Sequence, residues 1–269
     1  MSQSVTTIHL PSRWLGRQQP VSVIAPNRLT EDGRCYTIYL LHGTGGTNKS
    51  WSANSPIAEL AAEIPAAIVM PSAENSYYLD SQVAAMESFL CDELVPEVDN
   101  LFPTIKSAKG RAVTGYSMGG YGALLLALRR PELFGTAASH SGAVLTARAT
   151  TEVGIKWEQA DDLYGIGREG QLKRRDHDIL SLVQKYITVD PESGRERYTG
   201  PALYLDCGAD DFLFYASRAL TEAMRMLHIP YEYHEWPGDH NWEYWSTHLH
   251  DSLEFHLRQF ASFHARPSS

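Results

Sequence analysis

Residues 115–119, which read GYSMG, carry the clearest chemical signal in this sequence. The G-x-S-x-G spacing is typical of a nucleophile elbow, a sharp turn in which small residues allow close backbone packing and the serine is held exposed. A short β-branched stretch at 111–114 precedes the turn, and a Leu/Ala-rich stretch with helical propensity follows at 121–130. This context favours Ser117 as a nucleophile over a solvated serine in a glycine-rich turn.

A serine hydroxyl is a weak nucleophile at neutral pH, so it requires a general base and an acid that orients the base. His240 is the preferred base because it follows the expected strand 231–236 in a Pro-Gly loop, whereas His234 lies within that strand. The acid is expected after the strand 202–205, since α/β hydrolases place their acid between the serine and the histidine in the sequence. The candidates are Asp206, still on the strand, and Asp210 and Asp211 in the loop, which spacing alone does not separate.

A tetrahedral intermediate needs N–H donors for its negative oxygen, and removing one costs about 3 kcal/mol in comparable enzymes. The backbone N–H of Met118 is one candidate, because it begins the helix after the elbow. The second is the backbone N–H of Thr44, in the HGTGG loop that follows the apolar stretch 36–41. His42 is expected to brace this loop by hydrogen bonding.

Strands and helices alternate around these residues. The pattern predicts strands at 5–10, 21–26, 36–41, 66–70, 111–114, 134–139, 202–205 and 231–236, and helices at 55–64, 82–102, 121–130, 214–227 and 242–260. This alternation indicates an α/β fold with a mostly parallel central sheet and helices on both faces. The loops at the carboxyl ends of the strands are expected to form the site.

The segment 143–198 interrupts the alternation, with many charges, several glycines and one clear helical stretch at 178–186. It is expected to be an insertion that forms a lid or a substrate wall within a single domain over residues 1–269. Its basic cluster at 173–175 is interpreted as a solvated face.

Composition excludes several classes of function. A net charge of -9 and a pI near 5.6 argue against nucleic-acid binding. The spacing of histidines and cysteines matches no metal motif, and no dinucleotide or nucleotide loop is present, so neither a metal nor a cofactor is expected.

No apolar run of membrane length or signal-peptide core appears, which predicts a cytoplasmic protein without membrane contact. Cys35, Cys91 and Cys207 are predicted to be buried reduced thiols.

Five motifs occur in order between about residues 36 and 245. They are YLLHG at 39–43 with Gly45, Gly46 and Trp51; NSYY at 75–78 with Asp80; GYSMGG at 115–120; CGADDF at 207–212; and PGDHNW at 237–242. Together they resemble the Putative-esterase branch of the α/β-hydrolase superfamily. This branch holds esterase D or S-formylglutathione hydrolase, tributyrin esterases, feruloyl and acetyl-xylan esterases, and the mycolyltransferases.

The resemblance implies the α/β-hydrolase fold and assigns the acid. The last position of the family's Gly-x-x-Asp pattern falls on Asp211, the base on His240, and the oxyanion donors on Thr44 and Met118. Thr44 departs from the apolar residue that is usual at its position, which suggests a more polar acyl pocket. The segment 143–198 matches poorly and is expected to hold substrate specificity.

The function expected from the residues and the resemblance is a serine carboxylic-ester hydrolase that forms an acyl enzyme without a cofactor. Its partner is a small-molecule ester with a short-chain acyl, phenolic or sugar group, and a homo-oligomer is left open. Candidate substrate-binding residues are Trp51, Tyr77, Tyr78, Asp80 and Trp242, with Trp245 as a further aromatic. The alternatives are an S-formylglutathione-type thioesterase, an acyltransferase, and a catalytically silent α/β-hydrolase that serves as an interaction module.

Overall fold

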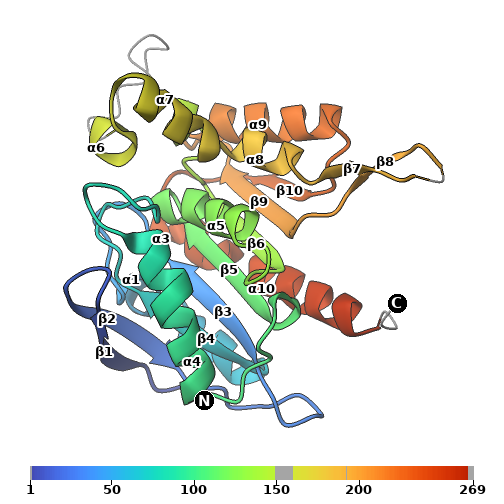
Figure 1. Cartoon of the computed structure of the whole chain (residues 1–269). Coiled ribbons are helices and arrows are strands. Elements are labelled where there is room, and N and C mark those ends of the chain that lie inside the picture. Colours follow the sequence, from blue (N-terminus) through green and yellow to red (C-terminus); the bar gives the residue numbers. More distant parts are fainter. Residues whose placement is uncertain (1, 149–159, 192, 266–269) are drawn as a thin grey trace.

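The computed structural model describes residues 2–148, 160–191 and 193–265, and an eight-stranded sheet runs through its centre (Figure 1). The strands, in spatial order, are β1 (Thr6–Ser12), β2 (Arg17–Ile24), β4 (Ala66–Pro71), β3 (Tyr36–Leu41), β5 (Arg111–Tyr116), β6 (Thr136–His140), β9 (Ala202–Gly208) and β10 (Glu232–Trp236). From β4 to β10 all neighbours are parallel, whereas β1 and β2 pair antiparallel with each other and β2 pairs antiparallel with β4. This confirms the predicted α/β fold with a mostly parallel sheet.

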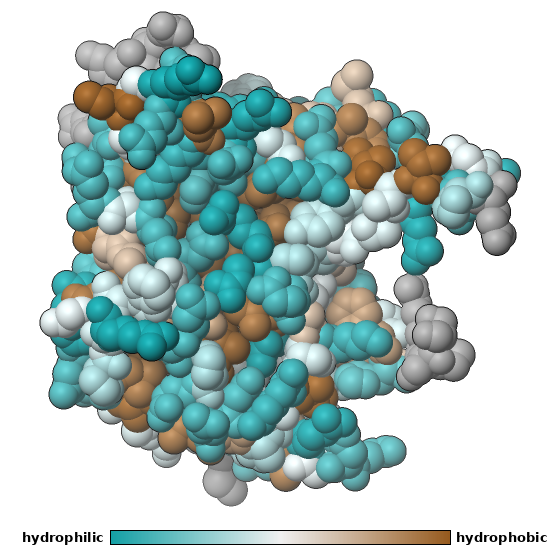
Figure 2. Space-filling view, in the orientation of Figure 1, coloured by the Kyte–Doolittle hydropathy of each residue, from teal (hydrophilic) through white to brown (hydrophobic). Residues whose placement is uncertain are grey.

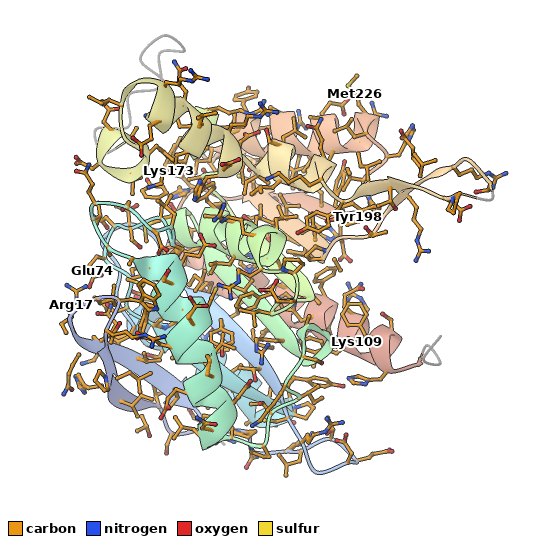
Figure 3. All side chains as sticks on the ribbon, viewed as in Figure 1. Arg17, Glu74, Lys109, Lys173, Tyr198 and Met226 are labelled. Carbon is orange, nitrogen blue, oxygen red and sulfur yellow. The ribbon has the colours of Figure 1, made fainter. Side chains whose placement is uncertain are left out.

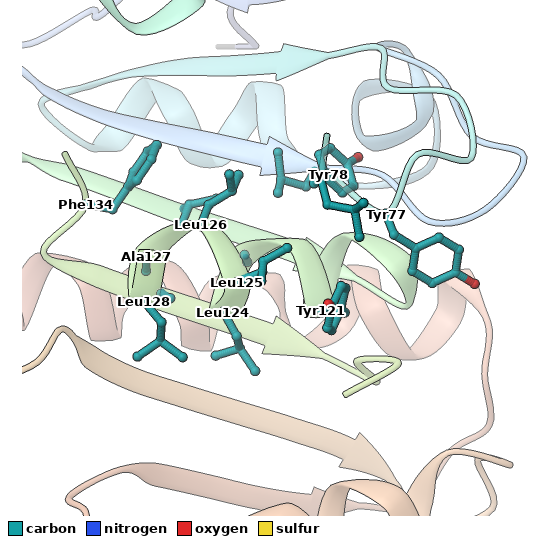
Figure 4. Packing of buried hydrophobic residues seen from close by; sticks show 14 of the residues in the cluster. Tyr77, Tyr78, Tyr121, Leu124, Leu125, Leu126, Ala127, Leu128 and Phe134 are labelled. Atoms are coloured by element: carbon teal, nitrogen blue, oxygen red, sulfur yellow. The ribbon is translucent and has the colours of Figure 1, made fainter. Parts of the chain in front are cut away.

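Helices cover both faces of the sheet, and each face has its own cluster of buried apolar residues. One face carries α1 (Ser50–Asn54), α2 (Ile57–Leu60) and the long α10 (Trp242–Ala265). The other carries α3 (Met86–Phe89), α4 (Val95–Leu101), α5 (Met118–Arg129), α8 (Ile179–Gln184) and α9 (Phe214–Met226). The residues of α5 from Met118 to Leu128 are all buried, because this helix packs against β5, β6 and α8. Figure 4 shows its leucines within the cluster of buried residues.

The helix predicted at 82–102 is interrupted. It starts at Met86, widens into a π-helical turn over Leu90–Leu94 and continues as α4. Pro96, in the first turn of α4, has no N–H for the α-helical hydrogen bond and is accommodated by the wider turn. The helix predicted at 55–64 is also shorter, because α2 passes into a 3₁₀ turn at Ala61–Glu63.

The segment 143–198 holds more structure than expected. In addition to α8 it contains α6 (Ala160–Tyr164), α7 (Gly167–Asp176) and the two-stranded hairpin of β7 (Ile187–Val189) and β8 (Glu196–Tyr198), so the expectation of one helical stretch was wrong. The predicted lid or wall also includes 149–159, which lie outside the described residues.

Polar contacts connect the highly polar α7 to α6. Arg174 pairs with Asp161 at 3.1 Å, and its guanidinium lies 4.9 Å from the ring centroid of Tyr164. Its side chain is only 14% exposed, so the basic cluster 173–175 is not entirely the solvated face that was expected. Hydrophilic side chains nevertheless cover most of the molecular face in Figure 2.

Polar contacts tie the loop after β4 to its surroundings. Arg17 of β2 pairs with Glu74 at 2.7 Å, and the two side chains lie together at the edge of the molecule in Figure 3. One residue further, the Asn75 Oδ1 accepts a hydrogen bond from the Gly45 N–H at 2.8 Å. The second contact connects this loop to the loop after β3, on which one oxyanion donor was predicted.

The three cysteines are free and buried, as predicted, and burial raises the pKa of each thiol.

Among the described residues, none of the helices combines the length and the apolar character that a membrane crossing requires. Within the same part of the chain, His, Cys, Asp and Glu side chains form no group that could hold a metal ion.

His256 of α10 is a neutral base enclosed by the fold. Its Nε2 lies 2.6 Å from the Thr114 Oγ1, and its Nδ1 hydrogen-bonds the Thr136 Oγ1. The side chain is fully buried, and this burial lowers its pKa to about 3, helped by repulsion from His140. The folded protein therefore resists protonation at a site where the unfolded chain accepts a proton readily.

We expect His256 to make the protein less stable in acid. The folded-state pKa lies below the unfolded value, so the stabilising contribution is complete above about pH 6.5 and is lost as the pH falls toward 3. The loss is up to about 1.4 kcal/mol per pH unit. Urea unfolding at about pH 7.5 and about pH 5.5 measures this slope.

The variant His256→Gln, which keeps hydrogen-bonding capacity toward both threonines, should show a shallower pH dependence than the wild type. His250→Gln is the matched control, because His250 lies on the same helix with a side chain that is 56% exposed. Equal slopes for the wild type and His256→Gln would contradict the prediction.

Candidate active site

Ser117 lies on the sharp turn between β5 and α5. Its φ of 55° and ψ of -119° belong to a region that residues with a side chain rarely adopt. The turn is held by the Ser117 N–H, which donates to the His140 carbonyl at 2.9 Å, and by the Ser117 carbonyl, which accepts from the Ala143 N–H at 3.1 Å. A Cβ on Gly115 would lie 2.2 Å from the Gly119 carbonyl oxygen, so the two flanking glycines permit the close approach that the motif predicts.

Two hydrogen bonds link Ser117 to a histidine and an acid. The Ser117 Oγ lies 3.0 Å from the His240 Nε2, and the His240 Nδ1 lies 2.8 Å from the Asp211 Oδ2. Asp211 follows β9 and His240 follows β10, and because these strands are parallel neighbours their carboxyl ends meet at one edge of the sheet. A carboxylate on Nδ1 favours the tautomer whose Nε2 can accept a proton from the serine.

Asp210 points elsewhere, so the structure separates the two acids that spacing did not. It is exposed, and its backbone N–H donates to the Gly238 carbonyl at 2.9 Å. Asp211 is buried, and its Oδ1 accepts the Leu213 N–H at 2.7 Å. Burial alone would raise the pKa of Asp211, but hydrogen bonds from His240 and the Leu213 N–H help to lower it below its usual value. Asp211 is therefore an ionised acceptor beside the imidazole at neutral pH.

The two predicted oxyanion donors belong to turns that approach Ser117. Met118 is the first residue of α5, where a backbone N–H has no acceptor within the helix. Thr44 follows Gly43, whose backbone lies so close to the serine that an added Cβ would be 3.1 Å from the Ser117 Cβ. The turns that carry both N–H groups thus lie beside Ser117, and their role as oxyanion donors stays a prediction.

His42 braces the turn that carries Thr44. The Nδ1 donates to the Gly43 carbonyl at 2.7 Å, because the Nε2 already accepts the Ala73 N–H at 2.9 Å. The residue is buried, and burial lowers its pKa, which keeps the imidazole neutral. This arrangement agrees with the structural role expected for His42.

Two of the aromatic residues predicted to bind substrate lie in the core. Trp51 is 1% exposed and its Nε1 donates to the Leu41 carbonyl at 3.0 Å, while Tyr78 is 0% exposed and its hydroxyl donates to the His42 carbonyl at 2.9 Å. Tyr78 packs in the cluster around α5, where Figure 4 shows it, whereas Trp51 packs in the cluster on the opposite face of the sheet. The expectation that they line an open pocket is corrected, because neither has surface left for a substrate.

The other three predicted substrate-binding residues differ in access. Tyr77 is 3% exposed and lies beside Tyr121, with 6.1 Å between the ring centroids, so the correction for Trp51 and Tyr78 applies to it as well. Burial raises its pKa to about 12. Asp80 accepts hydrogen bonds from the Ser88 N–H at 3.0 Å and the Ser88 Oγ at 2.6 Å, so it anchors α3. Trp242 is half-buried and lies closest to the site in sequence, two residues after His240.

Phe212 is a residue of this site to which the sequence analysis gave no role. Its ring centroid lies 4.4 Å from that of His240, and the residue is 70% exposed. On another side of the imidazole the buried Trp245 makes an edge contact at 4.9 Å. The available signal for Phe212 was its place directly after Asp211 in the CGADDF motif.

A second Ser-His-Asp arrangement lies inside the protein. The His140 Nδ1 is 2.7 Å from the Asp206 Oδ2, and the His140 Nε2 is 2.9 Å from the Ser252 Oγ. None of the three residues is more than 1% exposed, so no solute can reach Ser252. This network joins β6, β9 and α10, and it explains why Asp206 is unavailable to His240.

Comparisons with known proteins identify the family and the fold. Residues 12–256 match the family described as Putative esterase. An acetyl esterase of Caldicellulosiruptor saccharolyticus is 30% identical over 225 residues, which cover 81% of this chain and 82% of the relative.

Two solved structures from Staphylococcus aureus share the fold. One is the fluorophosphonate-binding serine hydrolase F, 23% identical with a TM-score of 0.80, where the match covers 96% of this chain and 99% of that chain. The other is an S-formylglutathione hydrolase, 24% identical with a TM-score of 0.77, where the match covers 96% of this chain and 100% of that chain.

Proposed function

This chain belongs to the Putative esterase family, and we propose that it cleaves short-chain acyl esters through Ser117, His240 and Asp211. Family membership makes it a carboxylesterase, and the proposal concerns the residues and the substrate. The observation that carries it is the pair of hydrogen bonds of 3.0 Å and 2.8 Å that joins the three side chains. The base in this chain is 15% exposed, so it lies within reach of a substrate.

In the first half of the reaction, the Ser117 Oγ attacks the ester carbonyl carbon while the His240 Nε2 takes the hydroxyl proton. The carbonyl oxygen becomes negative and accepts hydrogen bonds from the backbone N–H groups of Thr44 and Met118. The intermediate then collapses as the imidazolium gives its proton to the departing alcohol. The products are a free alcohol and an acyl group on Ser117.

In the second half, His240 takes a proton from water and the resulting hydroxide attacks the acyl carbonyl. The same two N–H groups stabilise the second negative oxygen. The imidazolium returns the proton to the Ser117 Oγ as the acid leaves. Asp211 remains ionised throughout and holds the imidazole with its Nδ1–H toward the carboxylate.

An acetyl or similarly short acyl group is the proposed acyl portion. The acetyl esterase relative supports this choice, and the exposed Thr44 is the residue expected to make the acyl side of the site more polar. A phenolic acyl group is the alternative that the following test distinguishes from a short one.

The test is hydrolysis of p-nitrophenyl acetate, p-nitrophenyl butyrate, methyl ferulate and S-formylglutathione by the purified protein. We expect kcat/KM for the acetate to exceed that for the butyrate by about tenfold, the discrimination that a pocket achieves between acyl chains of different length. A higher kcat/KM for methyl ferulate would contradict the short acyl group, and one for S-formylglutathione would identify a thioesterase. No turnover by folded protein would favour an acyltransferase or a silent interaction module.

A further inference from the structure

Phe212 presents an aromatic ring to solvent directly beside the proposed base. Single exposed apolar side chains are common on protein surfaces and need no explanation by themselves. This one differs because its ring centroid lies 4.4 Å from that of His240, with 51° between the two planes. Trp245, which also contacts the imidazole, is 6% exposed, against 70% for Phe212. Of these two rings, Phe212 is the one that a dissolved substrate can contact.

The backbone around Phe212 is fixed. The Asp211 N–H donates to the Gly208 carbonyl at 3.1 Å, and the Phe214 N–H donates to the Asp211 carbonyl at 2.9 Å. Leu213 is 7% exposed and its N–H is bound to the Asp211 side chain at 2.7 Å. Since the residues on both sides point inward, the Phe212 ring is held outward at the site, and a ligand that binds it need not order the loop.

The proposed reaction defines which part of an ester lies there. The His240 Nε2 takes the proton of Ser117 and delivers it to the departing alkoxide, so the alcohol portion must come next to the imidazole. The Phe212 ring lies tilted beside the imidazole with 4.4 Å between the ring centroids, so a flat group attached to the departing oxygen comes within reach of its exposed surface. The acyl portion is held instead between Ser117 and the predicted oxyanion donors.

We propose that Phe212 determines specificity for the alcohol portion of the ester, as a subsite for alcohols that carry a flat apolar or aromatic group. This inference rests on the proposed function and adds the leaving group to it. Contact between aromatic rings is favourable beyond the area that it buries. The contact exists only until the alcohol departs, so Phe212 acts on acylation and not on hydrolysis of the acyl enzyme.

The experiment uses ethyl, cyclohexylmethyl and benzyl acetate, which all give the same acetyl enzyme. Phe212→Ala should lower kcat/KM for benzyl acetate about tenfold and for ethyl acetate less than about twofold. The loss for cyclohexylmethyl acetate should fall between these two values. Under conditions where deacylation limits turnover, kcat should be the same for the variant and the wild type. Phe212→Tyr, which keeps the ring, should restore the preference for benzyl acetate.

Tyr215→Ala is the matched control. Tyr215 is 80% exposed and lies three residues further on, with its ring 5.5 Å from that of Phe214. This variant should keep the wild-type values for all three acetates.

An equal loss of kcat/KM on all three acetates would overturn the subsite, because it would mean that Phe212 merely supports His240. Unchanged kcat/KM in Phe212→Ala would overturn it as well. A wild-type protein that cleaves none of the acetates would instead refute the proposed function, so the two failures are distinguishable.

Discussion

Ser117→Ala is expected to lower kcat for p-nitrophenyl acetate by up to about 10⁶-fold. The substitution removes the Oγ that forms the acyl enzyme and leaves the backbone hydrogen bonds of Ser117 to His140 and Ala143 in place. Alanine keeps the Cβ of serine, so it adds no new steric cost at a φ of 55°. Steady-state kinetics measure the loss, and circular dichroism shows whether the variant is folded.

Ser252→Ala is the matched control, since Ser252 also hydrogen-bonds a histidine that is bound to an aspartate. It should keep activity close to that of the wild type and lose about 1–3 kcal/mol of stability, because the buried His140 Nε2 is left without its partner. If Ser117→Ala retained more than about a tenth of wild-type activity, Ser117 would not be the nucleophile.

The second large effect is expected at Asp211. Asp211→Asn should lower kcat about 10⁴-fold, because a neutral amide neither stabilises the imidazolium nor holds the tautomer whose Nε2 accepts the serine proton. The buried position of Asp211 and its 2.8 Å contact with the His240 Nδ1 make this loss specific to that carboxylate. The measurement is kcat for p-nitrophenyl acetate under saturating substrate.

The adjacent acid provides the comparison. Asp210→Asn changes an exposed carboxylate one residue away, and its backbone hydrogen bond to Gly238 is unaffected. This variant should stay within a few-fold of the wild type. Equal losses in the two variants, or a larger loss in Asp210→Asn, would remove Asp211 from the proposed role.

Much of the site could be predicted from local sequence because its residues lie on loops with strong signals. The glycines around Ser117 and the Pro-Gly turn before His240 identify sharp turns after strands, and parallel strands bring such turns to one edge. The choice between Asp210 and Asp211 was different. It depends on which side chain the turn after β9 directs inward, which spacing does not encode, so it rested on family resemblance.

Local sequence was least informative about aromatic side chains and about the segment 143–198. Trp51 and Phe212 are both aromatic residues near a loop, yet one is 1% and the other 70% exposed, because burial depends on which distant elements pack over them. In the segment 143–198, α7 has little apolar periodicity and is held by contacts such as Arg174 with Asp161. Such contacts form only after the chain has folded, so a pattern of local hydrophobicity does not predict them.

The positions of the proposed catalytic residues along the sequence determine when, during folding, the protein can become active. The hydrogen bond between Ser117 and His240 joins residues 123 positions apart, and the base lies in the loop after β10, which is the last strand of the sheet in the sequence. A chain emerging from the ribosome therefore carries its nucleophile and the oxyanion turn well before the groups that activate them. Because such long-range pairings form slowly, ester turnover during refolding should report the docking of β9 and β10, while the first half of the sheet can assemble without any gain in activity.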